Sequence, residues 1–262
     1  MSIQSPQSRM DDQRINMIFR NRRLTLHFHP ERHHAIFNDE LINFWANYMS
    51  TITNPSLRQF IHHCRCETRA TPENIQRGRL HMNLFDNGSH RFIDRHPIML
   101  IPFRTTENWS LGVIVNPQNV CIRNEKCKLI LFTTNREESV GYLDVIRTFL
   151  LKAHRIRNRM TYPENIVEFV MQKPKVQVFD SAFYVMAMIE LIYKQPRKFE
   201  RKTLVLKHYT RYAELHSVIQ QLTKSSMRYV FRSALLQFER TINTTGAIPN
   251  RPVTLLLDII ND

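Results

Sequence analysis

The sequence predicts an α+β domain in which a central sheet is packed by helices. Three short apolar runs in the middle of the chain, at residues 97–103, 109–115 and 129–132, have the length of buried strands. Longer segments with helical spacing of apolar residues lie on both sides of these runs, at 39–49 and 181–193. Strands grouped in mid-chain and flanked by helices are typical of the α+β class.

The N-terminal elements follow from local signals. Residues 1–20 are polar, and we expect a flexible lead there. Residues 22–28 alternate polar and apolar side chains, as a short strand does. An Asn-Asp pair at 38–39 supplies an N-cap for the helix that follows. A second helix is expected at about 55–64.

The later elements are assigned in the same way. Residues 140–153 predict a helix with a basic end, and 174–178 predict a short extended piece. The helix at 181–193 has almost no polar face, so we expect it to be buried. After about residue 221 the pattern is less regular. The apolar stretch 253–260 is expected to dock on the protein's own core or on a partner.

Composition excludes several classes of protein. The chain has 262 residues, enough for one sizeable core, and only 5 glycines, with no glycine-rich phosphate-binding motif. No apolar run approaches the roughly 20 residues that span a bilayer, and the polar N-terminus lacks a signal core. We therefore expect no membrane association and four reduced cysteines. The net charge of +14 favours an acidic partner, either nucleic acid or an acidic protein.

Four segments resemble the motifs of the Ulp1/SENP family, cysteine proteases that cut SUMO and related ubiquitin-like tails. Residues 36–45 read Ile-Phe-Asn-Asp-Glu-Leu-Ile-Asn-Phe-Trp and resemble the family's opening motif. Residues 99–115 resemble its second motif and keep the tryptophan, Trp109. Residues 131–134 and 179–185 resemble the third and fourth motifs, in the family's order. The resemblance covers roughly 22–220 and implies a papain-like fold with a mixed or antiparallel central sheet.

The resemblance fails at the residues that perform the chemistry. Asn108 stands at the position of the general-base histidine, Thr133 at the orienting aspartate and Ser181 at the nucleophilic cysteine. Lys175 falls at the oxyanion glutamine, with Gln177 close but out of register. An amide cannot take up a proton near neutral pH, and a serine hydroxyl needs a competent base. The sequence therefore predicts a pseudoprotease.

One alternative keeps hydrolase activity by pairing Ser181 with a histidine from elsewhere, such as His96, His154 or His208. Another concerns metal: residues 62–66 read His-His-Cys-Arg-Cys, and Cys121 and Cys127 could complete a zinc set. Cys-x-Cys is unusual spacing for structural zinc, so we favour ordinary thiols and predict no metal and no cofactor.

Two groups of candidate binding residues remain. In the family, aromatic residues wall the channel for a ubiquitin-like tail; Trp109 is kept here, although the opening motif begins with isoleucine. Asp39 of the opening motif is also retained, either as a binding residue or as a helix cap. Residues 152–159 form a basic run at a helix end, beyond what the helix dipole needs. We expect it to bind through its four basic side chains, Lys152, Arg155, Arg157 and Arg159.

The combined prediction is a lead at 1–20, a pseudoprotease domain at 21–222 and a helix with an apolar tail at 223–262. The predicted function is non-enzymatic, a protein-interaction scaffold or subunit of a complex. Its partners would be proteins, with a ubiquitin-like protein as one candidate. The alternatives are a basic nucleic-acid-associated module and a residual hydrolase that uses Ser181. The resemblance implies a nuclear or cytoplasmic setting.

Overall fold

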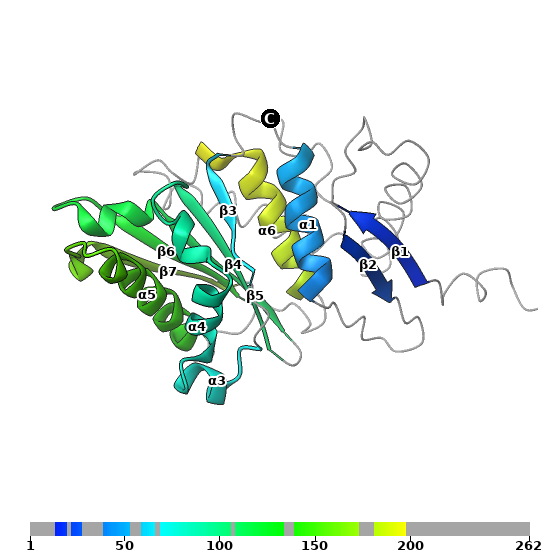
Figure 1. Ribbon diagram of the computed structural model, residues 1–262, viewed down its shortest axis with the longest axis horizontal. Coiled ribbons are helices and arrows are strands. Elements are labelled where there is room, and N and C mark those ends of the chain that lie inside the picture. The colour runs from blue at the N-terminus through cyan, green and yellow to red at the C-terminus, as the bar shows by residue number, and fades with distance from the viewer. Residues whose placement is uncertain are drawn as a thin grey trace, which may run out of the picture.

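The computed structural model describes residues 14–19, 22–27, 39–52, 59–65, 69–105, 108–133, 139–172 and 181–197. Its centre is a five-stranded sheet with helices on both faces (Figure 1). The predicted α+β class is therefore confirmed. Within the described residues, no helix is both long enough and apolar enough to cross a membrane.

The sheet is mixed, as predicted. Its strands, in spatial order, are β3 (Ile61–His63), β4 (Ile98–Arg104), β5 (Trp109–Val115), β6 (Cys127–Thr133) and β7 (Ile166–Gln172). The three central strands β4, β5 and β6 run antiparallel, whereas β3 is parallel to β4 and β7 is parallel to β6. The central strands are the three predicted apolar runs, and every residue of β5 and β6 is buried. Burial on both faces explains why they read as continuous apolar runs.

One face of the sheet is covered by α1 (Asp39–Ile52) and α6 (Ser181–Lys194). Both were predicted. The two helices pack against each other, and the Trp45 indole N–H donates to the backbone oxygen of Met186 at 3.0 Å. The helix of the first family-like motif is thus fixed directly to the helix of the fourth. Apolar residues of α6 are almost completely enclosed in this core.

The other face is covered by α5 (Ser139–Ile156) and α4 (Arg79–Asp86), with α3 (Pro72–Gln76) beyond them. The approach of α5 to the sheet depends on a glycine. A Cβ atom placed on Gly112 of β5 would lie 2.5 Å from the Cδ1 atom of Ile146, closer than van der Waals contact allows. A larger residue at position 112 would force the side chains of Ile146 and Phe103 to shift.

Three details differ from the sequence expectations. Arg14–Phe19, inside the expected flexible lead, forms β1, which pairs antiparallel with β2 (Arg22–His27) and sets Met17 opposite Leu24. Residues 61–63 form strand β3 rather than the end of a helix, because pairing with β4 holds them extended. Strand β7 was not predicted. The expected extended piece at 174–178 and everything after 197 lie outside the described residues.

Candidate functional site

Ser181, the predicted counterpart of a nucleophile, is the first residue of α6. Its hydroxyl oxygen accepts a hydrogen bond from the backbone N–H of Trp109 at 2.9 Å, across 72 positions of sequence. The side chain is buried, with 1% exposure. The hydroxyl therefore joins the start of α6 to the start of β5, and it does not face solvent.

Asn108 directly precedes β5, in a turn that Thr105 stabilises. The Asn108 backbone N–H donates to Thr105 Oγ1 at 2.8 Å, and the Thr105 N–H donates to the Asn108 backbone oxygen at 2.9 Å. The Asn108 Oδ1 atom is buried and has no hydrogen-bond partner among the described residues. A buried amide oxygen without a partner raises the free energy of the folded state by about 1–3 kcal/mol.

Thr133 ends β6 and is fully buried. Its Oγ1 atom accepts a hydrogen bond from the hydroxyl of Ser110 at 2.9 Å. Because Ser110 follows Trp109, the three predicted positions meet at one end of the β5–β6 pair. Where a catalytic triad would need a thiol, an imidazole and a carboxylate, this cluster holds two hydroxyls and an amide, none of which ionises near neutral pH.

Comparison with known protein families and with curated protein sequences finds no match. Comparison with solved structures finds similarity to a crystal structure of a de-sumoylating protease. The TM-score is 0.53 at 13% identity, covering 86% of this chain and 96% of the other. The chain has a SUMO-protease-like fold. Two structures of the SUMO protease Ulp1, with the catalytic cysteine oxidized to a sulfonic or a sulfinic acid, align at 13% identity with TM-scores of 0.46 and 0.45. They cover 72% and 82% of this chain, and 81% and 90% of theirs.

No histidine with a described side chain contacts Ser181. His96 bonds to the Gln59 backbone oxygen, 2.9 Å from its Nδ1 atom, and packs against His62. His154 is buried on the α5 side of the sheet, where its Nε2–H donates to the Pro117 carbonyl at 3.1 Å. His208 lies outside the described residues. Neither His96 nor His154 is therefore placed to act as a base for Ser181.

The cysteines with described side chains do not supply a substitute nucleophile. Burial raises the pKa of the Cys127 thiol to about 12, so the reactive thiolate is absent near neutral pH. Cys64 is also buried, and burial raises the pKa of half-buried Cys121. Within the described residues, no group of three or more His, Cys, Asp or Glu side chains could hold a metal ion. Cys66, part of the possible zinc set, lies outside them.

The candidate binding residues Trp109 and Asp39 have different settings. Trp109 is 4% exposed, and the guanidinium of Arg104 lies 5.7 Å from its ring centroid. The indole is therefore covered rather than presented to a ligand. Asp39 begins α1, as its role in the helix N-terminus predicts. Lys175 and Gln177, at the expected oxyanion position, lie outside the described residues.

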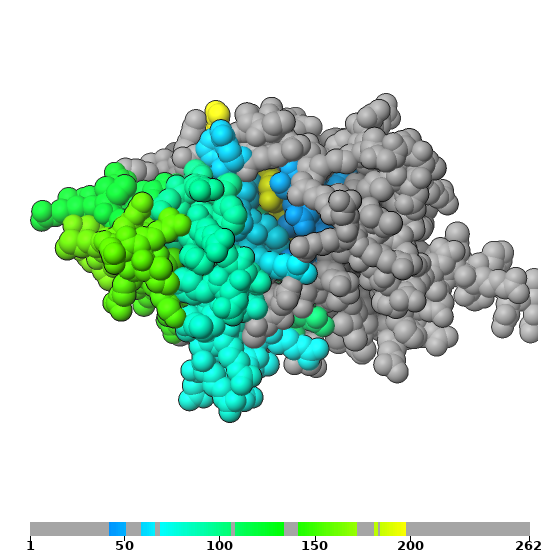
Figure 2. Space-filling model, viewed as in Figure 1, coloured from blue at the N-terminus to red at the C-terminus, as the bar shows by residue number. Residues whose placement is uncertain are grey.

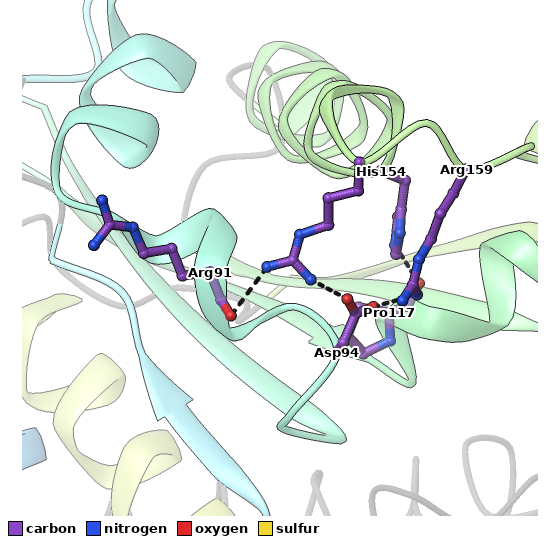
Figure 3. A network of polar contacts seen from close by, with 6 residues as sticks. Arg91, Asp94, Pro117, His154 and Arg159 are labelled. Atoms are coloured by element: carbon purple, nitrogen blue, oxygen red, sulfur yellow. Dashed lines mark hydrogen bonds and ion pairs between the residues drawn. The ribbon is translucent and has the colours of Figure 1, made fainter.

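The basic run at the end of α5 divides into two pairs. Arg157 and Arg159 both bind the carboxylate of Asp94, and the Arg159 contact measures 2.7 Å (Figure 3). Arg157 also donates to the backbone oxygen of Arg91 at 3.2 Å. Lys152 and Arg155 form no ion pair within the described residues. Sequence reasoning missed Asp94, although a lone acidic residue between Arg91 and Arg95 is a signal for such a pairing.

Proposed function

We propose that the protein is a catalytically inactive relative of the SUMO proteases that works as a protein-interaction module. The observation that carries the proposal is the state of Ser181, whose hydroxyl is buried and accepts the Trp109 amide hydrogen bond. A nucleophile needs a base within hydrogen-bond reach and access to its substrate. Ser181 has neither a described imidazole beside it nor an exposed hydroxyl.

The identities of the neighbouring residues support the same proposal. Asn108 cannot accept a proton, and Thr133 cannot carry the negative charge that would stabilise an imidazolium. Triad members act together, and losing them typically lowers kcat by several orders of magnitude. With all three positions replaced, the protein would act by binding a partner and not by cleaving it.

Turnover of fluorogenic SUMO and ubiquitin fusions tests the catalytic part of the proposal. We expect no turnover by the wild-type protein, by Ser181→Ala or by Ser181→Cys, because the thiol of the last variant would still lack a base. An active SUMO protease is the positive control. Wild-type turnover that disappears in Ser181→Ala would show that Ser181 is a working nucleophile and would overturn the proposal.

A ubiquitin-like protein is the first candidate partner, because the structural neighbour is described as a de-sumoylating protease. Calorimetric titration with SUMO and with ubiquitin tests this directly. Binding of SUMO or ubiquitin without cleavage would support a module that still binds a ubiquitin-like protein. The module is proposed to act in the nucleus or the cytoplasm.

The net charge of +14 supports a second candidate function, association with nucleic acid. Phosphate contacts release counterions, so such binding weakens steeply as salt rises. A duplex and a single-stranded oligonucleotide, each titrated at low and at physiological salt, separate this candidate from the first. Absence of binding at low salt would exclude it.

A further inference from the structure

On the face of the sheet opposite Ser181, helices α4 and α5 lie side by side (Figures 1 and 2). Apolar and basic side chains of the two helices form a mixed surface there. We call it the α4–α5 surface and define it by five residues: Met82 and Phe85 from α4, with Lys152, Arg155 and Ile156 from α5. It combines exposed apolar side chains with cations that form no ion pair within the described residues. Neither property is explained by the packing of the domain.

The apolar part is unusual for a monomer surface. Met82 is 44% exposed and Ile156 is 57% exposed, among the few large apolar side chains of the described residues that are open to solvent. Lys152 lies one helical turn before Ile156, and its Nζ atom lies 3.4 Å from the sulfur of Met82. Met82 therefore lies against the Lys152 ammonium, and Ile156 is the next residue along the same side of α5. Exposed apolar side chains that gather in this way indicate an interaction site.

The charged part is left without acidic partners. Besides the Met82 sulfur, the Lys152 ammonium contacts the ring of Phe85, with its Nζ atom 5.2 Å from the centroid. Among the described residues, no carboxylate lies within ion-pair distance of Lys152 or of the exposed Arg155. Asp86, at the end of α4, is exposed and makes no ion pair with either of them. The other two arginines of this run share the carboxylate of Asp94.

We propose that the α4–α5 surface binds an acidic, apolar segment of a partner protein. Carboxylates of the segment would pair with Lys152 and Arg155, and an aliphatic side chain would pack between Met82 and Ile156. Arginine and methionine are enriched at protein–protein interfaces, and methionine adapts to the shape of its ligand. The inference rests on the proposed function as an interaction module and names one of its surfaces and the chemistry of its partner.

The composition of this surface favours a protein over a nucleic acid. Binding of single strands relies on exposed aromatic faces for base stacking and on a track of cations along the backbone. Here the only aromatic residue, Phe85, is half-buried and already carries Lys152 against its ring. Two cations that form no ion pair in the described part of the chain, beside two exposed apolar side chains, match a short acidic segment better than a phosphate backbone.

Fluorescence anisotropy with the full-length protein tests the proposal. The probe is a labelled peptide of about 16 residues in which leucine recurs at helical spacing among glutamates. We expect a Kd on the order of 10–100 µM, as for a small transient interface. The variants Ile156→Asp and Lys152→Glu should each weaken binding about tenfold, since each removes one half of the surface. Ile122→Asp and Arg123→Glu, two exposed positions that do not belong to the α4–α5 surface, are the matched controls and should change the Kd less than about twofold.

Two further probes fix the chemistry. A peptide with serine at every leucine should bind about tenfold more weakly if Met82 and Ile156 contribute, and equal binding of both peptides overturns the apolar part. A single-stranded oligonucleotide of matched charge that binds more tightly, and is equally sensitive to Lys152→Glu, overturns the proposal in favour of nucleic acid. Failure of the leucine peptide to bind at about 500 µM also overturns it. None of these outcomes depends on reporter hydrolysis. The proposal for the α4–α5 surface can therefore be refuted while the proposed lack of catalysis still holds.

Discussion

Ser181→Ala tests whether the buried hydroxyl acts as a structural acceptor. The substitution removes the oxygen that accepts the Trp109 N–H at 2.9 Å and leaves that N–H buried without a partner. An orphaned buried donor costs about 1–3 kcal/mol. In a domain of this size, each kcal/mol lowers Tm by about 2–4 °C, so we expect a decrease of about 2–12 °C.

Differential scanning calorimetry of three variants makes the measurement specific. Ser89→Ala is the control, because Ser89 is 2% exposed and its hydroxyl has no hydrogen-bond partner within the described residues. It loses the same atom without losing a bond, so its Tm should fall little. Ser181→Cys should lie between Ser181→Ala and the wild type, since sulfur is a weak acceptor. A Tm for Ser181→Ala within about 1 °C of that of Ser89→Ala would refute the structural role.

Two further predictions concern stability. Met188, on α6, is 1% exposed, so Met188→Asp buries an unpaired carboxylate at a cost of several kcal/mol and should abolish the cooperative melting transition seen by circular dichroism. Met82→Asp, at an exposed position, should leave that transition nearly unchanged. Burial lowers the pKa of His62 to about 4 and that of His63 to about 3, so on acidification the unfolded chain takes up protons first. The free energy of unfolding should therefore be fully retained above about pH 6.5 and fall by on the order of 2 kcal/mol per ring at about pH 5. Urea titrations of a His62→Gln/His63→Gln variant should show a flatter pH dependence, and an unchanged slope would contradict this account.

The central strands and the two helices of the Ser181 face could be predicted because their signals are local and strong. Strands β4, β5 and β6 are apolar runs bounded by turns, and α1 and α6 carry long apolar stripes. Strand β3 could not be predicted, because its three residues are held extended by hydrogen bonds to β4 rather than by their own preference. Strand β7 was not predicted for a related reason. Its partner β6 lies more than 30 residues earlier, so the pairing that holds β7 extended is not local, and a glutamate interrupts its apolar run.

Helices α3 and α4, on the second face of the sheet, depend on backbone geometry that the sequence indicates only weakly. Helix α4 begins after Gly78, which has a left-handed φ of 67° and lets the chain turn between α3 and α4. Neither helix is long: α3 has 5 residues and α4 has 8, below the length at which periodicity identifies a helix from sequence. The α4–α5 surface could therefore not be predicted from the sequence, although two of its five residues, Lys152 and Arg155, belong to a basic run that the sequence indicated as a binding site.

The basic run at 152–159 shows that charge in the sequence does not predict which basic side chains form ion pairs in the fold. The sequence grouped Lys152, Arg155, Arg157 and Arg159 as one binding surface because they are neighbours in the chain. The structure separates them by their partners, since Asp94 is more than 60 residues away and lies beside only two of them. A cationic side chain that forms an ion pair with a carboxylate contributes mainly to the stability of the fold. A cationic side chain without such an ion pair remains available to a ligand. The pairing, and not the spacing, decides which arginines can bind.

The same reasoning applies to position 181. In a cysteine protease the side chain at this place must ionise and reach a substrate, and both demands oppose tight packing against the sheet. Serine removes them: its hydroxyl stays neutral and can be buried, where it accepts the Trp109 amide and fixes α6 to β5. On the proposed assignment of position 181 to the nucleophile, serine gives up a reactive group and gains a structural hydrogen bond there. The double variant Ser181→Cys/Asn108→His should therefore have a lower Tm than the wild type, even if it shows no turnover. The reason is that the larger sulfur must occupy a site packed around an oxygen.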